Sequence, residues 1–196
     1  EAAQVKPWYW EMLVLVLGWV LGLGTSYFGH WVQQHFEKRR RSETLKVAFR
    51  GEINALRSAL AADARAAVGA WEHKKTIKAY KLAYPSRIYD AHASMIGDLR
   101  ESVLVGHISQ LYSTLERAQD IGRRIEANTY GGDGLHDFAA LLVLAFHQAL
   151  ILDMRLTEQT KHLVELEWSV KVSEADAKDQ NFAAEALKKL EQAGAK

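Results

Sequence analysis

Histidine is the residue type in this chain with the widest chemistry, since it serves as a metal ligand, a general base or a pH-sensitive group. The chain has eight histidines and no cysteine. They stand at His30, His35, His73, His92, His107, His136, His147 and His162. No pair has the spacing of a metal site, and on one helix His136 and His147 would lie about 16 Å apart. We therefore expect no metal centre.

Other catalytic signatures are also missing from the sequence. It contains no His-Glu-x-x-His and no Gly-x-Ser-x-Gly, and its glycine-rich turn Gly131-Gly132-Asp133-Gly134 lacks the lysine of a phosphate-binding loop. His107 and His147 are the remaining candidates for a hydrolase, but spacing assembles no nucleophile, base and orienting group around them. The sequence favours a protein that is not an enzyme.

The strongest pattern is a long stretch without charge. Between Met12 and Gln34 there is no Asp, Glu, Lys or Arg, with Trp8 and Trp10 before the stretch and Trp31 near its end. Twenty-one residues of helix at about 1.5 Å each give roughly 31 Å, close to a hydrocarbon core of about 30 Å. The run is longer than that of a signal peptide, and tryptophan rings settle at the headgroup level. The sequence predicts a transmembrane helix over residues 11–35.

The charges on the two flanks predict the orientation of this helix. Residues 1–11 hold one lysine against two glutamates, whereas the other end leads into the basic cluster Lys38, Arg39, Arg40 and Arg41. Because positive flanks stay in the cytoplasm, we expect residues 1–10 outside a bacterial cytoplasmic membrane and the chain after about residue 35 inside. The basic cluster would also attract anionic lipid. With a net charge of only +1, the chain is not expected to bind nucleic acid.

Small residues follow one face of the predicted membrane helix. Gly18, Gly22 and Ser26 recur at intervals of four. Such a face lets helices approach closely within lipid, so it is a candidate surface for membrane helix packing. The alternative is that glycine is simply common in membrane helices.

His30 is the side chain in the uncharged stretch that most readily ionises near neutral pH, and Ser26 lies one turn before it. This pattern resembles the pigment-ligating pattern of light-harvesting polypeptides, and an imidazole can equally hold a haem. The resemblance implies a haem- or chlorophyll-bearing accessory subunit of a bioenergetic or light-harvesting complex. The competing interpretation is an interfacial histidine whose ring reaches water and headgroups, in a chain without cofactor.

Beyond the anchor, apolar residues recur every three or four positions, which is typical of amphipathic helices rather than strands. Three stripes predict long helices over 42–71, 100–127 and 135–172, and nothing forces a break between the first of these and the membrane helix. The stripes are Leu45, Phe49, Ile53, Leu56 and Leu60; Leu104, Ile108, Leu111, Leu115, Ala118, Gly122 and Ile125; and Phe138, Leu142, Ala145, Ala149, Leu152, Leu156, Leu163 and Val170.

The fold class expected from these helices is all-α. Residues 36–172 should form a cytoplasmic antiparallel bundle of three long helices and a short one over 87–96. Asn128 to Gly134 supply turn residues able to adopt positive φ, with Asp133 as a cap. The apolar run 138–152 is too short for a second span. Residues 173–196, rich in Ala, Lys, Glu and Gln, are expected to be an exposed helix or flexible tail.

The segment from Tyr84 to Leu99 has the most individual composition. It reads Tyr-Pro-Ser-Arg-Ile-Tyr-Asp-Ala-His-Ala-Ser-Met-Ile-Gly-Asp-Leu, and the following helix carries Ile108, Leu111, Tyr112 and Leu115. With its anchor, its aromatic-Pro-x-x-hydrophobic-Tyr-Asp-Ala run and its Ile-Gly-x-Leu turn, the chain resembles a broad group of uncharacterised bacterial single-pass membrane proteins. The resemblance covers about residues 10–120. It implies an N-terminal anchor and a cytoplasmic helical domain rather than an activity.

Two interpretations of this segment remain open. As a structural corner, Pro85 would end a helix, Tyr89 would pack into the bundle and Gly97 would reverse the chain. The alternative is a partner-binding surface made by four side chains, Tyr84, Arg87, Asp90 and His92.

Together these observations favour a non-enzymatic, membrane-anchored helical scaffold or accessory subunit that acts through protein–protein contacts in the membrane and the cytoplasm. Its expected partners are the lipid bilayer and another membrane protein or complex. The sequence points to no small-molecule substrate. The alternative is the cofactor-bearing subunit built on His30.

Overall fold

The computed structural model describes residues 8–73, 87–99, 101–130, 133–160 and 172–194. These residues form helices and a few turn residues, without a β-strand among them, so the all-α class is confirmed for the described chain. The elements are α1 (Trp8–Glu72), α2 (Arg87–His92), the 3-10 helix η1 (Ala93–Leu99), α3 (Ser102–Glu126), α4 (Gly134–Thr160) and α5 (Val172–Gly194). The chain divides into two compact units, Glu1–Ser42 and Glu43–Lys196, and α1 contributes residues to both.

The first unit consists of the N-terminal part of α1 and is covered by exposed apolar side chains. They are Trp10, Met12, Leu13, Val14, Leu15, Val16, Leu17, Trp19, Val20, Leu21, Leu23, Tyr27, Phe28, Trp31 and Phe36. Two described helices, α1 from Met12 onward and α4, are long and apolar enough to cross a membrane. The apolar part of α1 is 0% buried, whereas 61% of the apolar part of α4 is buried. Length and composition therefore do not distinguish these helices, but burial does.

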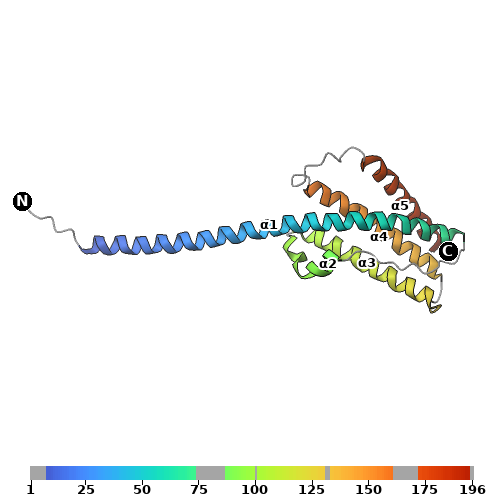
Figure 1. Ribbon diagram of the computed structural model, residues 1–196, viewed down its shortest axis with the longest axis horizontal. Helices are drawn as coiled ribbons and strands as arrows, with labels where there is room; N and C mark the ends of the chain where they lie inside the picture. Colours follow the sequence, from blue (N-terminus) through green and yellow to red (C-terminus); the bar gives the residue numbers. More distant parts are fainter. Residues whose placement is uncertain (1–7, 74–86, 100, 131–132, 161–171, 195–196) are drawn as a thin grey trace, which may run out of the picture. The chain divides into compact units, whose positions relative to one another are not determined.

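The second unit is a helical bundle around a continuous apolar core. The predicted α1 stripe is buried throughout, with Leu45 6% exposed and Phe49, Ile53, Leu56 and Leu60 fully enclosed. In Figure 1 this part of α1 lies alongside α3, α4 and α5, whose own stripes complete the core. Each such side chain contributes about 1.5–3 kcal/mol when fully buried. The predicted stripes are buried where they are described, except that Gly122 and Ile125 near the end of α3 are half-buried, and Leu163 and Val170 lie outside the described residues.

The turn between α3 and α4 has the predicted chemistry. Asn128 adopts a positive φ of 50°, and the Asp133 carboxylate accepts a hydrogen bond from the His136 backbone N–H at 3.1 Å, which caps α4. On α3, a Cβ added at Gly122 would lie 3.1 Å from the Phe138 ring. A side chain at this position would therefore require the Phe138 ring to shift by a few tenths of an ångström.

The direction of α3 differs from the predicted antiparallel order. Lys46 pairs with Glu101 just before α3, and Glu52 further along α1 pairs with Tyr112 further along α3. Positions on both helices increase together, so α1 and α3 run in parallel. The reason is the course of α2, which places the Tyr89 backbone beside Glu52 rather than near the end of α1.

α5 is part of the core, which corrects the expectation of an exposed helix or flexible tail over 173–196. Ala183, Ala186 and Leu190 are at most 3% exposed, and the Phe182 ring lies 6.2 Å from that of Phe146 on α4. The buried face of α5 consists largely of alanines among charged residues. The polar composition of residues 173–196 gave no indication of this buried face. Ala183, Ala186 and Leu190 nevertheless have the spacing of three and four residues that is typical of a helix face.

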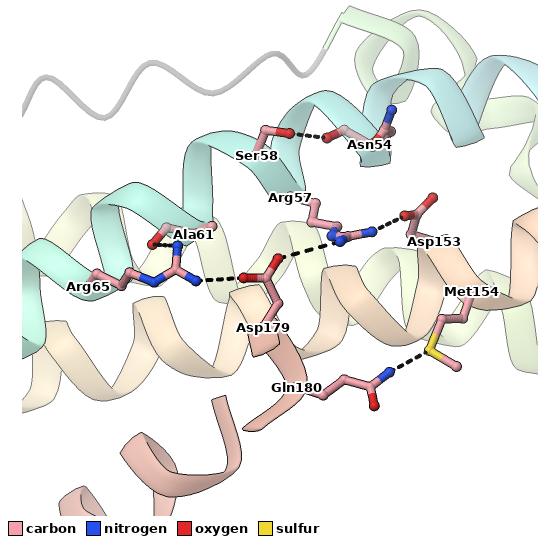
Figure 2. Close-up of polar contacts among 9 residues, drawn as sticks. All are labelled: Asn54, Arg57, Ser58, Ala61, Arg65, Asp153, Met154, Asp179 and Gln180. Atoms are coloured by element: carbon pink, nitrogen blue, oxygen red, sulfur yellow. Dashed lines mark hydrogen bonds and ion pairs between the residues drawn. The ribbon is translucent and has the colours of Figure 1, made fainter. Parts of the chain in front are cut away.

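A partly buried ion-pair network fastens the start of α5 to α1 and α4 (Figure 2). Arg57 on α1 reaches Asp153 on α4 at 2.8 Å and Asp179 on α5 at 3.4 Å, while Arg65 reaches Asp179 at 2.5 Å. The side chains of Arg57, Asp153 and Asp179 are only 12%, 11% and 17% exposed. Arg65 also lies over the Phe182 ring, 5.0 Å from its centroid. One aspartate on α5 thus joins two arginines of α1.

The end of α5 is held by a histidine on α4. The Nε2 atom of His136 lies 2.9 Å from the Leu190 carbonyl oxygen, and its Nδ1 lies 3.3 Å from Asp137. The ring stands edge-on to Trp71 of α1 at 5.6 Å. The pKa of His136 is raised, chiefly because its ring N–H donates to the Leu190 carbonyl and secondarily because Asp137 stabilises the charged form. Both ends of α5 are therefore attached by polar contacts as well as by apolar packing.

Replacement of Asp179 by asparagine removes the carboxylate that Arg57 and Arg65 share. Arg57 keeps its pair with Asp153 and Arg65 is about half exposed, so the loss is that of charged hydrogen bonds, and we expect the free energy of unfolding to fall by about 1.5–3 kcal/mol. The measurement is urea unfolding of the full chain in detergent, followed by far-UV circular dichroism. The control is Lys189→Gln, which breaks the exposed pair between Lys189 and Glu72 on the same two helices and should lower stability by at most about 1 kcal/mol. Equal losses in both variants would contradict the role given to Asp179.

Candidate partner-binding groove

A buried carboxylate on α1 organises the surface formed by α2 and α3. Glu52 is 7% exposed and accepts a hydrogen bond from the hydroxyl group of Tyr112 on α3. The backbone N–H of Tyr89 on α2 donates to the same carboxylate oxygen at 3.4 Å. Since a buried charge is stable only when it is paired or hydrogen bonded, these donors explain how Glu52 is tolerated in the core face of α1.

The two tyrosine rings are stacked against each other. Their centroids lie 3.9 Å apart at an interplanar angle of 17°. The pKa of Tyr112 is raised well above its usual range, first by burial of the phenol, then by its hydrogen bond to Glu52 and by the charges of Glu52 and Asp90. Tyr112 therefore stays neutral and remains a donor to Glu52 at physiological pH.

A groove of about 300 Å³ opens beside the stacked rings. Its walls come from α2 and from one face of α3. The lining residues are Tyr89, Asp90, Ser109, Tyr112, Ser113, Leu115, Glu116 and Gln119. Two of these side chains are acidic and none is basic, so the described walls of the groove are negatively charged.

Only part of the predicted partner-binding surface is described. Asp90 is exposed and lines the groove. Tyr84 lies outside the described residues, and Arg87 and His92 belong to α2 without described side chains. Tyr89 packs against Tyr112, as the structural-corner interpretation expected. Tyr112 and Glu52 carry no motif that predicts a site, although Glu52 lies three residues after Phe49 and four before Leu56, the spacing of the buried stripe.

The predicted membrane-packing face lies open in the described chain. A Cβ built on Gly18 or Gly22 meets no heavy atom within 4 Å. The third member of this face is Ser26. Its side chain and that of Trp8 are not among those that the structure describes. The two glycines thus leave a strip of bare backbone on α1.

The side chains near the end of the uncharged stretch interact along the helix. His30 Nε2 lies 2.8 Å from the Gln34 side-chain nitrogen. The Trp31 ring stacks with Phe28 at 6.0 Å and with His35 at 5.7 Å. Trp10 and Trp31 are both more than half exposed. No group of three metal-ligating side chains occurs among the residues that the structure describes.

The basic cluster that follows is fully on the surface. Lys38, Arg39, Arg40 and Arg41 are all exposed, and Arg41 lies 3.9 Å from Glu37 one turn earlier. The cluster therefore presents positive charge directly after the apolar part of α1.

Comparison with known proteins gives no relative: no family model, curated protein or solved structure matches this chain. The groove and the apolar helix must be interpreted from their own geometry.

Replacement of Tyr112 by phenylalanine keeps the ring stack but leaves the buried Glu52 carboxylate without its hydroxyl donor. We expect the free energy of unfolding to fall by about 1–3 kcal/mol, the usual loss for a buried polar group deprived of a partner. Urea unfolding of the full chain in detergent measures it. Tyr130→Phe is the matched control, because the Tyr130 hydroxyl bonds Asp137 at an exposed position. An equally large loss in the control would show that burial of Glu52 is not the cause.

Proposed function

We propose that this chain is a non-enzymatic, membrane-anchored helical protein that serves as a scaffold or accessory subunit. Residues 1–10 lie outside the bacterial cytoplasmic membrane, α1 crosses the bilayer, and the bundle acts in the cytoplasm. The supporting observation is the apolar surface that surrounds the N-terminal part of α1 and is buried by nothing else in the described chain.

The distribution of this apolar surface favours lipid over water. Leu13, Val14, Leu15, Val16 and Leu17 are consecutive and all exposed, so they point in every direction around the helix. A surface helix of a globular protein carries its apolar residues on one stripe, whereas a helix that is apolar all round is buried or spans a membrane. Each Å² removed from water contributes about 25 cal/mol, which strongly favours insertion of so long a segment.

The orientation follows from the exposed basic cluster at the end of the apolar part. Arg and Lys within about 15–20 residues of a transmembrane end favour the cytoplasmic side. The cluster Lys38–Arg41 meets this condition, and its exposed side chains could attract anionic headgroups.

A role in protein contacts is supported by the second unit. Its surface carries an acidic groove between α2 and α3.

The double variant Leu17→Arg and Leu21→Arg tests membrane insertion. Each arginine at the centre of a membrane helix costs about 2.5–3.5 kcal/mol on insertion scales, so we expect the variant to be released by an alkaline carbonate wash that leaves the natural chain in the membrane pellet. The control, Asn54→Arg and Ser58→Arg, adds the same charges at the same spacing to an exposed face in the bundle part of α1. Release of the natural chain, or retention of both variants, would contradict the anchor.

Single cysteines test the orientation, because the natural chain contains none. In spheroplasts, a membrane-impermeant maleimide should label Gln4→Cys at once and Ser102→Cys only after lysis. Ser102 is suitable because it is exposed at the start of α3. The reverse labelling pattern would place the bundle outside.

Purification from native membranes tests the role as a subunit. In mild detergent we expect a second protein to co-purify with the chain in fixed stoichiometry. Size-exclusion chromatography with light scattering gives the mass of the complex, and mass spectrometry identifies the second protein. A monodisperse monomer free of any companion would count against a scaffold or accessory subunit.

A further inference from the structure

We propose that the groove between α2 and α3 receives the side chain of an arginine from a partner protein. This inference locates the contact that the proposed function requires, and in naming a protein as the source of the arginine it rests on that function. The groove itself belongs wholly to the bundle unit and is defined without reference to the membrane.

Electrostatics selects a cation. Asp90 on α2 and Glu116 on α3 line the groove from its two walls, and the buried carboxylate of Glu52 lies behind the tyrosine pair. No lysine or arginine is among the described lining residues. The charges of Glu52 and Asp90 both act on the Tyr112 hydroxyl, so the negative potential reaches the aromatic wall of the groove.

The aromatic wall selects a guanidinium among cations. Tyr89 and Tyr112 both line the groove, and Tyr89 is only partly buried. A planar guanidinium stacks on aromatic rings and is less strongly hydrated than an ammonium group. Stacking of this kind contributes about 0.5–1 kcal/mol at exposed sites and more where water is excluded.

The remaining wall supplies hydrogen-bond acceptors. Ser109, Ser113 and Glu116 follow one another at intervals of four and three on one face of α3, and Gln119 continues that face. A guanidinium carries five N–H donors, and the hydroxyl, amide and carboxylate oxygens of this face can accept from them. The volume of about 300 Å³ lies at the lower end of the range of ligand pockets and suits one side chain.

Titration of the full chain in detergent tests recognition of the side chain. The tyrosines are labelled with ¹³C, and the probe is the peptide acetyl-Gly-Arg-Gly-amide, with acetyl-Gly-Gln-Gly-amide as its neutral counterpart. We expect millimolar arginine peptide to shift the ring signals of Tyr89 and Tyr112, an effect that added salt weakens and that the glutamine peptide does not produce. Absence of these shifts would overturn the proposal.

Charge variants test whether the arginine peptide binds in the groove. Asp90→Asn with Glu116→Gln should weaken binding of the arginine peptide at least about tenfold, the effect of losing about 1.4 kcal/mol. Asp120→Asn with Glu126→Gln changes the net charge equally at positions of α3 that do not line the groove, and it should bind as the natural chain does. Unchanged circular dichroism shows that each variant is folded. Equal weakening of peptide binding in both variants would show that overall charge causes the effect, and it would contradict binding in the groove.

A second arm distinguishes a partner protein from a free guanidine or amine. A photo-reactive amino acid is placed at Ser113 in the groove or at Arg117, which is exposed on α3 but does not line the groove, and cross-linking is carried out in intact cells. We expect a protein adduct at position 113, attached beside an arginine of the partner and lost in the Asp90→Asn, Glu116→Gln variant. Peptide binding without such an adduct would assign the groove to a free small molecule. Because peptide binding does not require the anchor, this outcome is separate from failure of the membrane tests.

Discussion

The bundle depends on the apolar stripe that α1 carries from Leu45 to Leu60. Its residues are almost completely enclosed, and they lie against the stripes of α3 and α4 and the alanine face of α5. Full burial of each of these side chains contributes about 1.5–3 kcal/mol before the entropic cost of ordering the chain is counted. α1 shares this core with the other helices, and α4 packs closely against both α3 and α5.

Polar groups on α1 then decide which neighbour lies where. Apolar packing is not directional, so a stripe of leucines tolerates several arrangements of its neighbours. Arg57 selects positions on α4 and α5 through Asp153 and Asp179, and Glu52 selects α2 and α3 through Tyr89 and Tyr112. Buried ion pairs and hydrogen bonds of this kind add specificity, because a different register would leave charges without partners. The contacts of Glu52 with Tyr89 and Tyr112 are made in the parallel arrangement of α1 and α3.

The sequence predicted local features well, because these depend on neighbours three or four residues away. The buried stripes, the positive φ of Asn128 and the cap at Asp133 are of this kind. The buried face of α5 was missed because its alanines contribute little to average hydrophobicity. Two further features of the fold, an ion-pair network and the groove, have no signal in the local sequence.

The first of these features is the network of Arg57, Asp153 and Asp179, which joins residues about a hundred positions apart. The second is the groove, whose tyrosines meet only after α2 has returned to the start of the bundle part of α1. Chain direction and long-range pairing are set by the whole fold, so neither could be derived from periodicity. The apolar stretch of α1 was read from composition directly, and its exposed surface supports the proposed anchor.

Glu52 links the stability of the bundle to the proposed recognition of a cation. Its carboxylate is almost fully withdrawn from water and is held by the donors on Tyr112 and Tyr89. A negative charge in such surroundings is only partly screened, so it acts over the distance to the groove as well as on its direct partners.

A guanidinium bound in the groove would lower the electrostatic free energy of that buried charge. It would thereby favour the conformation in which α2 is docked and the tyrosine rings are stacked. Any ligand that binds only this conformation stabilises it in proportion to the logarithm of ligand concentration over Kd. The Glu52 carboxylate would then contribute both to recognition of a partner and to attachment of α2 to the core. By thermodynamic linkage, docking of α2 would strengthen binding of the guanidinium to the same extent that the guanidinium strengthens docking of α2.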